Sequence, residues 1–577
     1  MQKQNTNLKP SELKPWLKYV PKTSIGAEVP ERTLYEHLKE TCKGYMGKTA
    51  LHYYGTNITF SQLLENIEKT ADAFTAMGVK KGDIVSLCTV CFPETVYAFY
   101  ALNKLGAISD FMDPRTHPDG IEQMIREAES DILIVVNLAW PKVEYFRSRL
   151  SLKKIIIQSA NTSLPPIKKL AKTLQGGVPK VPFDNDVLSW NDFISLGKST
   201  TSCDVPFEAD SVATIVHTGG TTGFPKGVML TNTGLNAVSK NFELSGVHIS
   251  LDQKFLNIMP PFSSYGISCG VHTPLTQGLE VTLIPKFEPD KIGYLIKKYR
   301  PAHMMGVPAF YEKLINSKEM KNFDLSFFET AGSGGDTMNA ALEAKLNGFL
   351  KSHGGKYPLS QGYGMSEVSA AASCCYNDTF RSLSVGIPML TTTVAIFKPG
   401  TTEELGFNEE GEVCISGPTV MKGYFKRDDE TAKVLIKHPD GKTWMHSGDM
   451  GYMDEDGFIF IKGRIKRMII RFDGHKVFPS HIESVLAKHD SVFSCAVVDT
   501  PDTQHGQGMY PVAIVELKES HRGNEEQIKK ELIELSDIEL EERGRPYDIV
   551  FIDKMPRTSV GKIDYRTLPE YYLSQKK

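Results

Sequence analysis

Short apolar runs rich in β-branched residues alternate with longer amphipathic stretches in the first third of the chain. The runs lie at residues 83–87, 131–136 and 154–157, and a helical pattern occupies residues 94–105. Continuous apolar runs of this length are typical of strands buried on both faces, as in parallel sheets whose crossover connections are helices. The pattern therefore predicts an α/β fold with mainly parallel sheets.

The same pattern continues through the middle of the chain and then changes. Residues 213–218, 281–284 and 302–307 are further predicted strands. From about Val394 the apolar segments become short and alternating, which predicts a β-rich subdomain. Residues 451–461 predict a hairpin with an Asp-Glu-Asp-Gly turn.

The last part of the chain follows a charged connector, Gly463–Lys466, and has strand and helix signals of its own. These signals lie at residues 495–498 and 525–542 and predict a small α+β domain joined through that connector. We place the boundary at the end of the connector. Residues 1–465 would then form a large N-terminal domain, and residues 466–577 a small C-terminal domain.

Composition and charge exclude several classes of protein. The 577 residues include 66 Lys and Arg against 69 Asp and Glu, so no basic field attracts nucleic acid. The N-terminus is too polar for a secretory signal, and the most apolar region, residues 83–108, is too polar for a transmembrane segment. Nine scattered cysteines, including the lone pair Cys88 and Cys91, are interpreted as reduced thiols of a cytoplasmic protein. Peripheral membrane contact stays open.

Residues 217–228 carry the strongest chemical signal, reading His-Thr-Gly-Gly-Thr-Thr-Gly-Phe-Pro-Lys-Gly-Val directly after an apolar run. Glycines let backbone N–H groups approach oxyanions, threonine hydroxyls add donors, and Lys226 adds a compact positive charge. The segment is therefore a candidate polyphosphate loop at the carboxyl end of a strand. It is not a Walker loop, because Lys226 follows Pro225 and precedes Gly227. The alternative is a surface turn without a ligand.

This segment resembles the phosphate loop of the adenylate-forming superfamily, which includes acyl-CoA synthetases, luciferases and the adenylation domains of peptide synthetases. Further segments resemble that superfamily, in its order along the chain: Ala331–Asp336, Gln361–Glu367, Ser447–Asp449, Gly463–Lys466 and Met555–Asp564. The resemblance covers nearly the whole chain and points to the acyl-CoA synthetase branch. It implies an α/β N-terminal domain with a β-rich subdomain, followed by a small hinged α+β domain.

The resemblance implies a role for each matched residue. Tyr363 would stack on adenine, Glu367 would hold Mg²⁺, Asp449 would accept hydrogen bonds from the ribose hydroxyls, and Arg464 would contact ribose or phosphate. The implied ATP-binding set is Thr218, Gly219, Gly220, Thr221, Thr222, Gly223, Lys226, Gly334, Gly335, Tyr363, Gly364, Ser366, Glu367, Asp449, Arg464 and Lys562. The implied catalytic residues are Lys562, Glu367 and Thr218, with Glu367 as the metal ligand.

The implied reaction has two steps. A carboxylate attacks the α-phosphate of MgATP and gives acyl-AMP and pyrophosphate, while Lys562 bridges the reacting oxygens. The C-terminal domain then turns about its connector, and the thiol of CoA displaces AMP. The expected co-substrates are a carboxylic acid, ATP and CoA, with Mg²⁺ as the metal ion.

Pro260–Gly266 resembles the acyl-pocket segment, which implies that Phe262, Ser263, Tyr265 and Gly266 contact the acid. Many relatives carry His at the position of Ser263, so we expect a wider pocket mouth here. Relatives that activate amino acids place Asp after the Phe to hold the ammonium group. An ammonium group without such a partner is costly in an apolar pocket. A neutral-tailed acid, fatty or aryl, is therefore the expected substrate.

The hinge departs from the superfamily, which commonly has Asp where this chain has Arg467. Rotation of the C-terminal domain depends on backbone torsions, so we expect it to be retained. Any ion pair that an Asp at this position would form is lost. Because of this departure, an acyl acceptor other than CoA stays an alternative. That acceptor would be the phosphopantetheine of a carrier protein or an amine. A non-catalytic nucleotide-binding module is the remote alternative, and the presence of Glu367 and Lys562 disfavours it.

Overall fold

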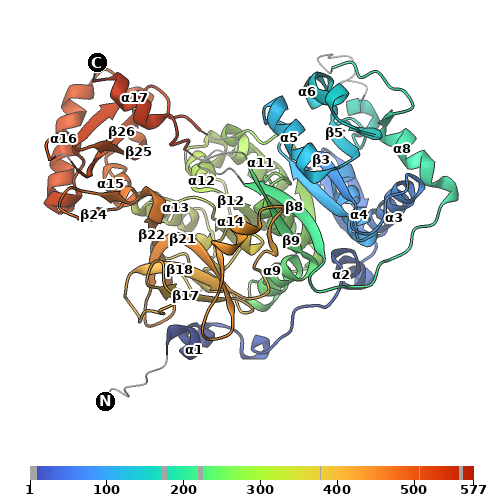
Figure 1. The fold of residues 1–577 in the computed structure, drawn as a ribbon, viewed down its shortest axis with the longest axis horizontal. Helices are drawn as coiled ribbons and strands as arrows, with labels where there is room; N and C mark the ends of the chain where they lie inside the picture. Colours follow the sequence, from blue (N-terminus) through green and yellow to red (C-terminus); the bar gives the residue numbers. More distant parts are fainter. Residues whose placement is uncertain are drawn as a thin grey trace.

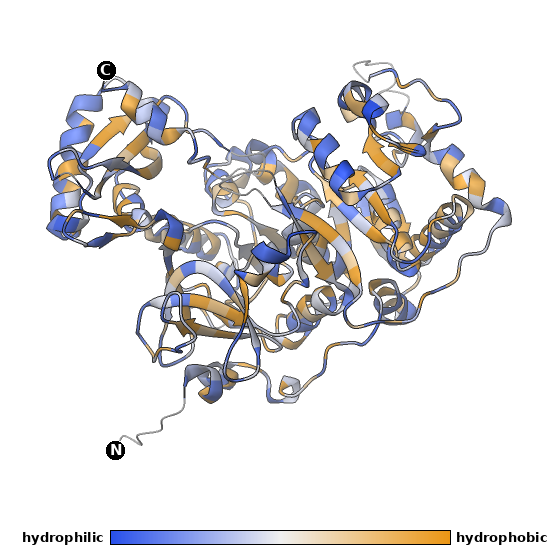
Figure 2. Ribbon diagram, viewed as in Figure 1, coloured by the Kyte–Doolittle hydropathy of each residue, from blue (hydrophilic) through white to orange (hydrophobic). Residues whose placement is uncertain are grey.

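The computed structural model describes residues 9–169, 179–218, 225–376, 379–505, 507–557 and 563–576. In Figure 1 the C-terminal elements lie to one side of a larger N-terminal part. Strands are mostly apolar and the outer helices carry many hydrophilic residues, as the colours of Figure 2 show. In the described part of the chain, no helix has both the length and the apolar character needed to cross a bilayer.

The first large sheet leads into the predicted phosphate loop. Its strand order is β19-β9-β8-β4-β3-β5-β6-β7. The six strands from β8 to β7 run parallel, and β9 returns antiparallel to β8. The bounds are β3 Ile84–Cys88, β4 Ile108–Met112, β5 Ile132–Val136, β6 Lys154–Gln158, β7 Val187–Ser189, β8 Val212–Thr218, β9 Lys226–Thr231 and β19 Gly423–Tyr424. Every residue of β5 is buried, which confirms a strand covered on both faces.

The helices of this part begin at the expected local signals. Thr59 caps α3 through a capping box with Gln62, and Pro93 occupies the first turn of α4. All of α4 is buried, including Lys104, whose ammonium group is 3.3 Å from a carboxylate oxygen of Glu68. The bounds are α3 Phe60–Ala76, α4 Pro93–Lys104, α5 Pro118–Ala128, α6 Trp140–Phe146 and α8 Trp190–Leu196.

The second large sheet has the order β16-β15-β14-β13-β12-β10-β11-β1-β2 and is parallel from β14 to β1. Its strands are β1 Thr49–Tyr53, β2 Thr56–Thr59, β10 Lys254–Asn257, β11 Glu280–Leu283, β12 His303–Gly306, β13 Thr330–Ser333, β14 Ser360–Tyr363, β15 Ser373–Cys374 and β16 Ile387–Pro388. Its helices are α2 Leu34–Thr41, α9 Asn232–Leu244, α10 Thr273–Thr276, α11 Ile292–Tyr299, α12 Pro308–Ile315 and α13 Ala340–Ser352, with a π-helix at Tyr265–His272. The two sheets confirm the predicted α/β class.

An antiparallel sheet follows and confirms the predicted β-rich subdomain. It contains β17 Thr393–Phe397, β18 Gly411–Ser416, β20 Leu435–Lys437, β21 Thr443–Met453 and β22 Ile459–Arg464, next to the short helices α1 Pro10–Leu13 and α14 Asp428–Ala432. The predicted hairpin is β21 and β22. The predicted alternation was wrong for β18, which is buried throughout. One apolar cluster includes Val413 and another includes Cys414, so both faces of this strand are covered.

The C-terminal part contains sheets and apolar clusters of its own. Its strands are β23 Ile469–Ile470, β24 Lys476–Val477, β25 Val492–Pro501, β26 Met509–Leu517 and β27 Asp548–Phe551. Its helices are α15 Pro479–Leu486, α16 Glu525–Glu539 and α17 Leu568–Ser574. Two clusters of buried residues contain only residues beyond position 468. These elements have the small α+β character that the sequence predicted.

Candidate active site

A cavity of about 2600 Å³ lies where the two large sheets, the β-rich subdomain and the C-terminal elements meet. The carboxyl ends of β8, β13 and β14 open into it, which is the usual ligand position of open α/β sheets. The described site residues that line it are Thr218, Lys226, Phe262, Ser263, Tyr265, Gly334, Gly335, Tyr363, Gly364, Ser366, Glu367, Asp449 and Arg464. The predicted site residues Gly219, Gly220, Thr221, Thr222, Gly223 and Lys562 lie outside the described residues.

The two ends of the predicted phosphate loop are held together by the β8–β9 pairing. Thr218 is opposite Lys226 in that ladder. The preceding His217 is anchored by a 2.7 Å contact of its Nε2 with Oδ1 of the buried Asp110. The ladder therefore gives the intervening loop a fixed base at the edge of the cavity.

Lys226 is held at the cavity wall by two partners. Its Nζ lies 2.9 Å from Oε2 of Glu430 on α14 and 4.1 Å from the centre of the Tyr424 ring. The hydrogen bond from Lys226 lowers the pKa of the Glu430 carboxyl group. A phosphate group at the predicted site would compete with Glu430 for this ammonium group. Sequence reasoning missed both partners, Glu430 and Tyr424. A signal that could have indicated Tyr424 is its position, in Gly423-Tyr424, shortly after an apolar segment.

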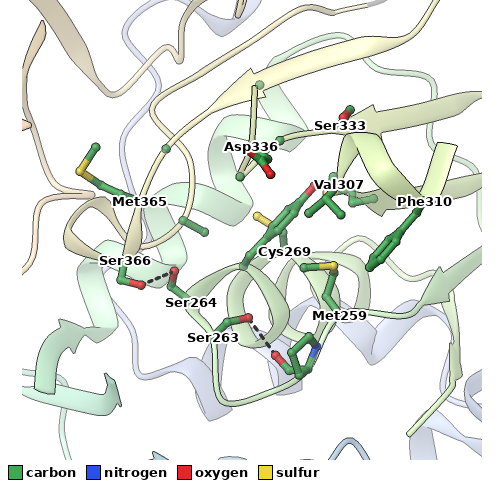
Figure 3. Close-up of a pocket in the computed structure, with 18 of the residues that line it drawn as sticks. Met259, Ser263, Ser264, Cys269, Val307, Phe310, Ser333, Asp336, Met365 and Ser366 are labelled. Atoms are coloured by element: carbon green, nitrogen blue, oxygen red, sulfur yellow. Dashed lines mark hydrogen bonds between the residues drawn. The ribbon is translucent and has the colours of Figure 1, made fainter. Parts of the chain in front are cut away.

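Glu367 is oriented by the same tyrosine. The Tyr424 hydroxyl donates a 2.8 Å hydrogen bond to Oε1 of Glu367. Burial and the nearby Glu367 charge raise the pKa of Tyr424, so its hydroxyl stays protonated and remains a donor. The neighbouring Ser366 receives a hydrogen bond from Ser264, shown in Figure 3 with an Oγ–Oγ distance of 3.2 Å. The short helix carrying Glu367 is thus tied to both the acyl side and β19.

This carboxylate fits a magnesium ion held mainly by phosphate oxygens. Mg²⁺ in nucleotide sites usually takes one or two carboxylates and keeps water and phosphate ligands. Only Oε1 of Glu367 is hydrogen-bonded to Tyr424, so Oε2 can serve as a ligand. Among the described residues, the single group of three close metal-ligating side chains lies elsewhere, at Glu412, Cys414 and His446.

Asp449 joins two other predicted site residues. Its Oδ1 is 2.9 Å from Nε of Arg464, and its Oδ2 accepts a 2.6 Å hydrogen bond from the Tyr363 hydroxyl. The structure therefore brings together three residues that sequence reasoning assigned to adenine, ribose and phosphate contacts. Asp449 is buried, whereas about half of the Arg464 side chain is exposed and can reach a ligand.

A buried polar pair supports the turn that carries Asp449. The Glu412 carboxylate accepts a 2.9 Å hydrogen bond from the backbone N–H of Gly448 and lies 2.9 Å from Nδ1 of His446. Gly448 has a φ of +70°, a conformation that favours glycine. These contacts fix the carboxylate of Asp449 on the cavity side of β21.

The glycines of the site have packing reasons that the sequence did not reveal. A Cβ on Gly364 would lie 1.9 Å from the carbonyl oxygen of Ala370. A Cβ on Gly334 would meet the carbonyl oxygen of Gly362 at 3.1 Å. Close approach between backbone segments therefore requires these glycines even before a ligand is considered.

The part of the cavity predicted to bind the acyl group is built on the π-helix and the turn before it. Ser263 donates a 2.9 Å hydrogen bond to the Pro260 carbonyl and accepts one of 3.0 Å from Gly266 N–H. Its side chain is therefore engaged with its own turn, as Figure 3 shows. Gly266 does not line the cavity, and a Cβ there would lie 1.8 Å from the Pro260 oxygen. Gly266 is thus required for the turn itself.

The remaining wall of this region is largely apolar. Figure 3 shows the side chains of Met259, Cys269, Val307 and Phe310 around the same space, together with the carboxylate of Asp336. Oδ1 of Asp336 accepts a 2.8 Å hydrogen bond from the backbone N–H of Thr337. The Tyr265 hydroxyl donates to the Gly306 carbonyl at 3.3 Å. The apolar side chains of this wall suit an apolar acyl tail.

The C-terminal elements close one side of the cavity. Ile563, Asp564, Tyr565 and Arg566, which directly follow Lys562 in the sequence, line it. The segment that contains Lys562 is flanked by an isolated antiparallel bridge between Arg557 and Ile563. Sequence reasoning predicted that Lys562 meets the nucleotide; Lys562 lies outside the described residues, and the residues that follow it border the same cavity as Glu367 and Asp449.

Comparison with known proteins adds independent information. Residues 38–425 match the family described as AMP-binding enzyme, and residues 481–562 match the AMP-binding enzyme C-terminal domain. A long-chain-fatty-acid–CoA ligase of Bacillus subtilis (strain 168) is 32% identical over 573 residues, covering 96% of this chain and 98% of that protein. A probable 4-coumarate–CoA ligase 1 of Dictyostelium discoideum is 30% identical over 518 residues, covering 88% and 89%. The structure of the anthranilate CoA ligase AuaEII in complex with anthranoyl-AMP has the same fold, with a TM-score of 0.81 at 23% identity and coverage of 95% and 99%.

Proposed function

Because this chain belongs to the AMP-binding enzyme family, we propose that its cavity joins a carboxylic acid to the thiol of CoA through an acyl-AMP intermediate. The chain is an acid–thiol ligase of the acyl-CoA synthetase branch, and its substrates are fatty or aryl acids. The observation that carries the proposal is the convergence of Lys226, Glu367, Asp449 and Arg464 on one cavity with an apolar acyl side.

The chemistry explains why ATP is required. A carboxylate is a poor acyl donor, because its leaving group would be an oxide. Attack of a carboxylate oxygen on the α-phosphorus of ATP forms a C–O–P anhydride bond and releases pyrophosphate. Attack of the CoA sulfur on the acyl carbon then breaks that C–O bond, loses the thiol proton and releases AMP. The first step replaces oxide, a poor leaving group, with AMP, a good one, and the second step uses the departure of AMP to form the thioester.

On the nucleotide side, different residues would bind the phosphates, the magnesium ion and the ribose. Thr218, Lys226 and the loop from Gly219 to Gly223 would hold the β- and γ-phosphates, after Lys226 exchanges Glu430 for phosphate oxygens. Glu367, oriented by Tyr424, would hold Mg²⁺, which neutralises phosphate charge when bound. Asp449 and Arg464 would contact the ribose and phosphate.

The acyl side favours a neutral tail. The wall includes Met259, Val307 and Phe310, and Ser263 is engaged with its own turn rather than with a charged group. The fatty-acid ligase of Bacillus subtilis matches this chain over nearly the full length of both proteins, which supports a fatty acid over an aryl acid. We therefore propose a medium- or long-chain fatty acid as the preferred substrate.

The two steps would use two arrangements of the C-terminal domain, residues 466–577. In the first, Lys562 would enter the cleft and bridge the carboxylate and the α-phosphate. In the second, rotation about the connector at Gly463–Lys466 would withdraw it and admit the thiol. Lys562→Ala should abolish acyl-AMP formation and leave thioester formation from supplied acyl-AMP largely intact. Equal loss of both half-reactions would contradict this division.

A panel of carboxylic acids, scored for AMP formation with and without CoA, tests the proposal. We expect acid-dependent pyrophosphate release without CoA, and acyl-CoA plus AMP when CoA is present. Fatty acids should give the highest kcat/KM, and amino acids should give none. ADP as the product, or turnover only with the phosphopantetheine of a carrier protein, would overturn the assignment. Nucleotide binding without turnover for any acid would favour a non-catalytic module.

A further inference from the structure

We propose that Arg467 is a positioning residue that holds the segment following Lys562 in place for acyl-AMP formation. Together with Glu483 and Tyr565 it forms what we call the hinge latch. This inference rests on the proposed function, because it assigns the latch to the first half-reaction. It gives a physical role to the hinge residue at which this chain departs from its superfamily.

The latch is defined by contacts on one face and at one edge of the Arg467 guanidinium group. The carbon at the centre of this group lies 3.7 Å from the centre of the Tyr565 ring. Nη2 is 2.6 Å from Oε1 of Glu483 and donates a 3.2 Å hydrogen bond to the Val497 carbonyl. Oε1 of Glu483 also accepts hydrogen bonds of 2.8 Å from Val497 N–H and 3.3 Å from the Tyr565 hydroxyl. The side chains of Arg467, Glu483 and Tyr565 therefore each contact the other two.

Only arginine satisfies this arrangement. A planar guanidinium can stack on an aromatic face while its edge donates to a carboxylate and a carbonyl. Lysine would keep the charge but lose the planar stacking. Aspartate, the common superfamily residue, would place a second negative charge beside Glu483. The pair with Glu483 also raises the pKa of Arg467 against the opposing effect of burial, which keeps the guanidinium charged.

The latch connects the hinge to the cleft. Arg467 directly follows the connector Gly463–Lys466 and ends the short helix Ile465–Arg467, and Tyr565 follows Lys562 by three residues. Tyr565, Arg467 and Glu483 all line the cavity together with Gly334 and Asp336 of the larger domain. Burial raises the pKa of Tyr565, and the negative charges of Glu483 and Asp336 add to that effect. The stacked ring therefore sits where the C-terminal segment faces the nucleotide side.

One consequence concerns the point about which the domain turns. The latch partners of Arg467, Glu483 and Tyr565, and the Val497 carbonyl that it also contacts all belong to the C-terminal part. The side chain of Arg467 is therefore packed as part of that domain, and the rotation must take place at Lys466 or before it. Breaking the latch would loosen both the end of the connector and the root of the Lys562 segment.

The test compares variants of the full-length protein in the two half-reactions. Tyr565→Leu removes the ring, Tyr565→Phe keeps it, and Arg467→Lys keeps the charge alone. Acid-dependent ATP–pyrophosphate exchange reports acyl-AMP formation, and thioester formation from supplied acyl-AMP reports the second step. We expect Tyr565→Leu to slow exchange about tenfold and thioester formation by less than about twofold. Tyr565→Phe should restore exchange to within about threefold, and Arg467→Lys should fall between the two. Tyr547→Leu, which removes a ring stacked on Tyr510 in the same domain, is the matched control.

A second readout is independent of activity. Lys466 is exposed, so trypsin can cut the bond between it and Arg467 when the connector opens locally. We expect Tyr565→Leu to be cut about tenfold faster than the wild type, and Tyr565→Phe at the wild-type rate. Unchanged cutting, unchanged exchange, or equal losses in both half-reactions would each overturn the latch. If the wild type shows no exchange with any acid, the proposed function fails, while the trypsin rates still decide whether the latch exists.

Discussion

Replacing Tyr424 with Phe isolates one hydrogen bond at the centre of the proposed nucleotide site. The hydroxyl donates to Oε1 of Glu367 at 2.8 Å, while the ring lies 4.1 Å from Nζ of Lys226. Tyr424→Phe removes the first contact and keeps the second. The backbone pairing of β19 with β9 does not involve the hydroxyl, so the fold should be unaffected.

The magnitude follows from the charge on the acceptor. A hydrogen bond to a charged group contributes about 1.5–3 kcal/mol, and the partly exposed position of Glu367 favours the lower end of that range. About 1.4 kcal/mol corresponds to a factor of ten in an equilibrium constant. Groups that orient a metal ligand commonly change metal affinity or activity by about 10–100-fold when removed. We therefore expect the Mg²⁺ concentration for half-maximal activity to rise about tenfold, with kcat at saturating Mg²⁺ reduced less.

The assay is acid-dependent pyrophosphate release at fixed ATP over a range of Mg²⁺ concentrations. Tyr452→Phe is the control, because that tyrosine stacks on Phe460 at 4.8 Å and its side chain does not line the cavity. Glu367→Gln should lose activity at every Mg²⁺ concentration. If Tyr424→Phe shows the wild-type Mg²⁺ requirement while Glu367→Gln is inactive, Tyr424 does not orient the metal ligand and the reasoning is wrong.

Three further changes give distinct outcomes. Glu430→Gln should lower the KM for ATP by about two- to fivefold at constant kcat, because it removes the carboxylate that competes for Lys226. The ion pair is partly exposed and contributes at most about 1 kcal/mol. A higher KM would show that Glu430 helps to bind ATP. Burial raises the pKa of Glu94 to about 7, so the folded protein keeps its proton while the unfolded chain loses it, and stability falls as pH rises from about 4.5 to 7. Glu94→Gln should therefore gain stability over the wild type between pH 5 and pH 8, by up to about 3 kcal/mol in urea unfolding; an equal difference at both pH values would refute this. Gly266→Ala should lower the melting temperature and abolish acid activation, because its Cβ would lie 1.8 Å from the Pro260 oxygen, and wild-type values for both would contradict the tight packing of this turn.

Local chemistry and periodicity could be predicted from the sequence. The strands β3, β5 and β8 lie where apolar β-branched runs predicted them, because burial on both faces favours mainly apolar residues in such a strand. The loop before Lys226 was predicted to bind phosphate from its glycines, threonines and lysine. Glu367 was predicted as a metal ligand from the resemblance of its segment to the superfamily, and both assignments stay predictions. The hairpin of β21 and β22 was predicted from its turn residues.

Partners far apart in the chain were decided by the tertiary structure alone. The Tyr424 hydroxyl meets Glu367 across 57 positions, and Tyr363 meets Asp449 across 86. From the sequence, Arg467 was noted only because it replaces the Asp that is common in the superfamily. In the structure it stacks on the Tyr565 ring and pairs with the Glu483 carboxylate. No periodicity encodes such pairs, because they depend on how separate sheets and domains pack. The sequence by itself determined which functional groups are available and on which elements they lie; only the packing of those elements decided which groups touch, because contact depends on distances in space that residue spacing does not specify.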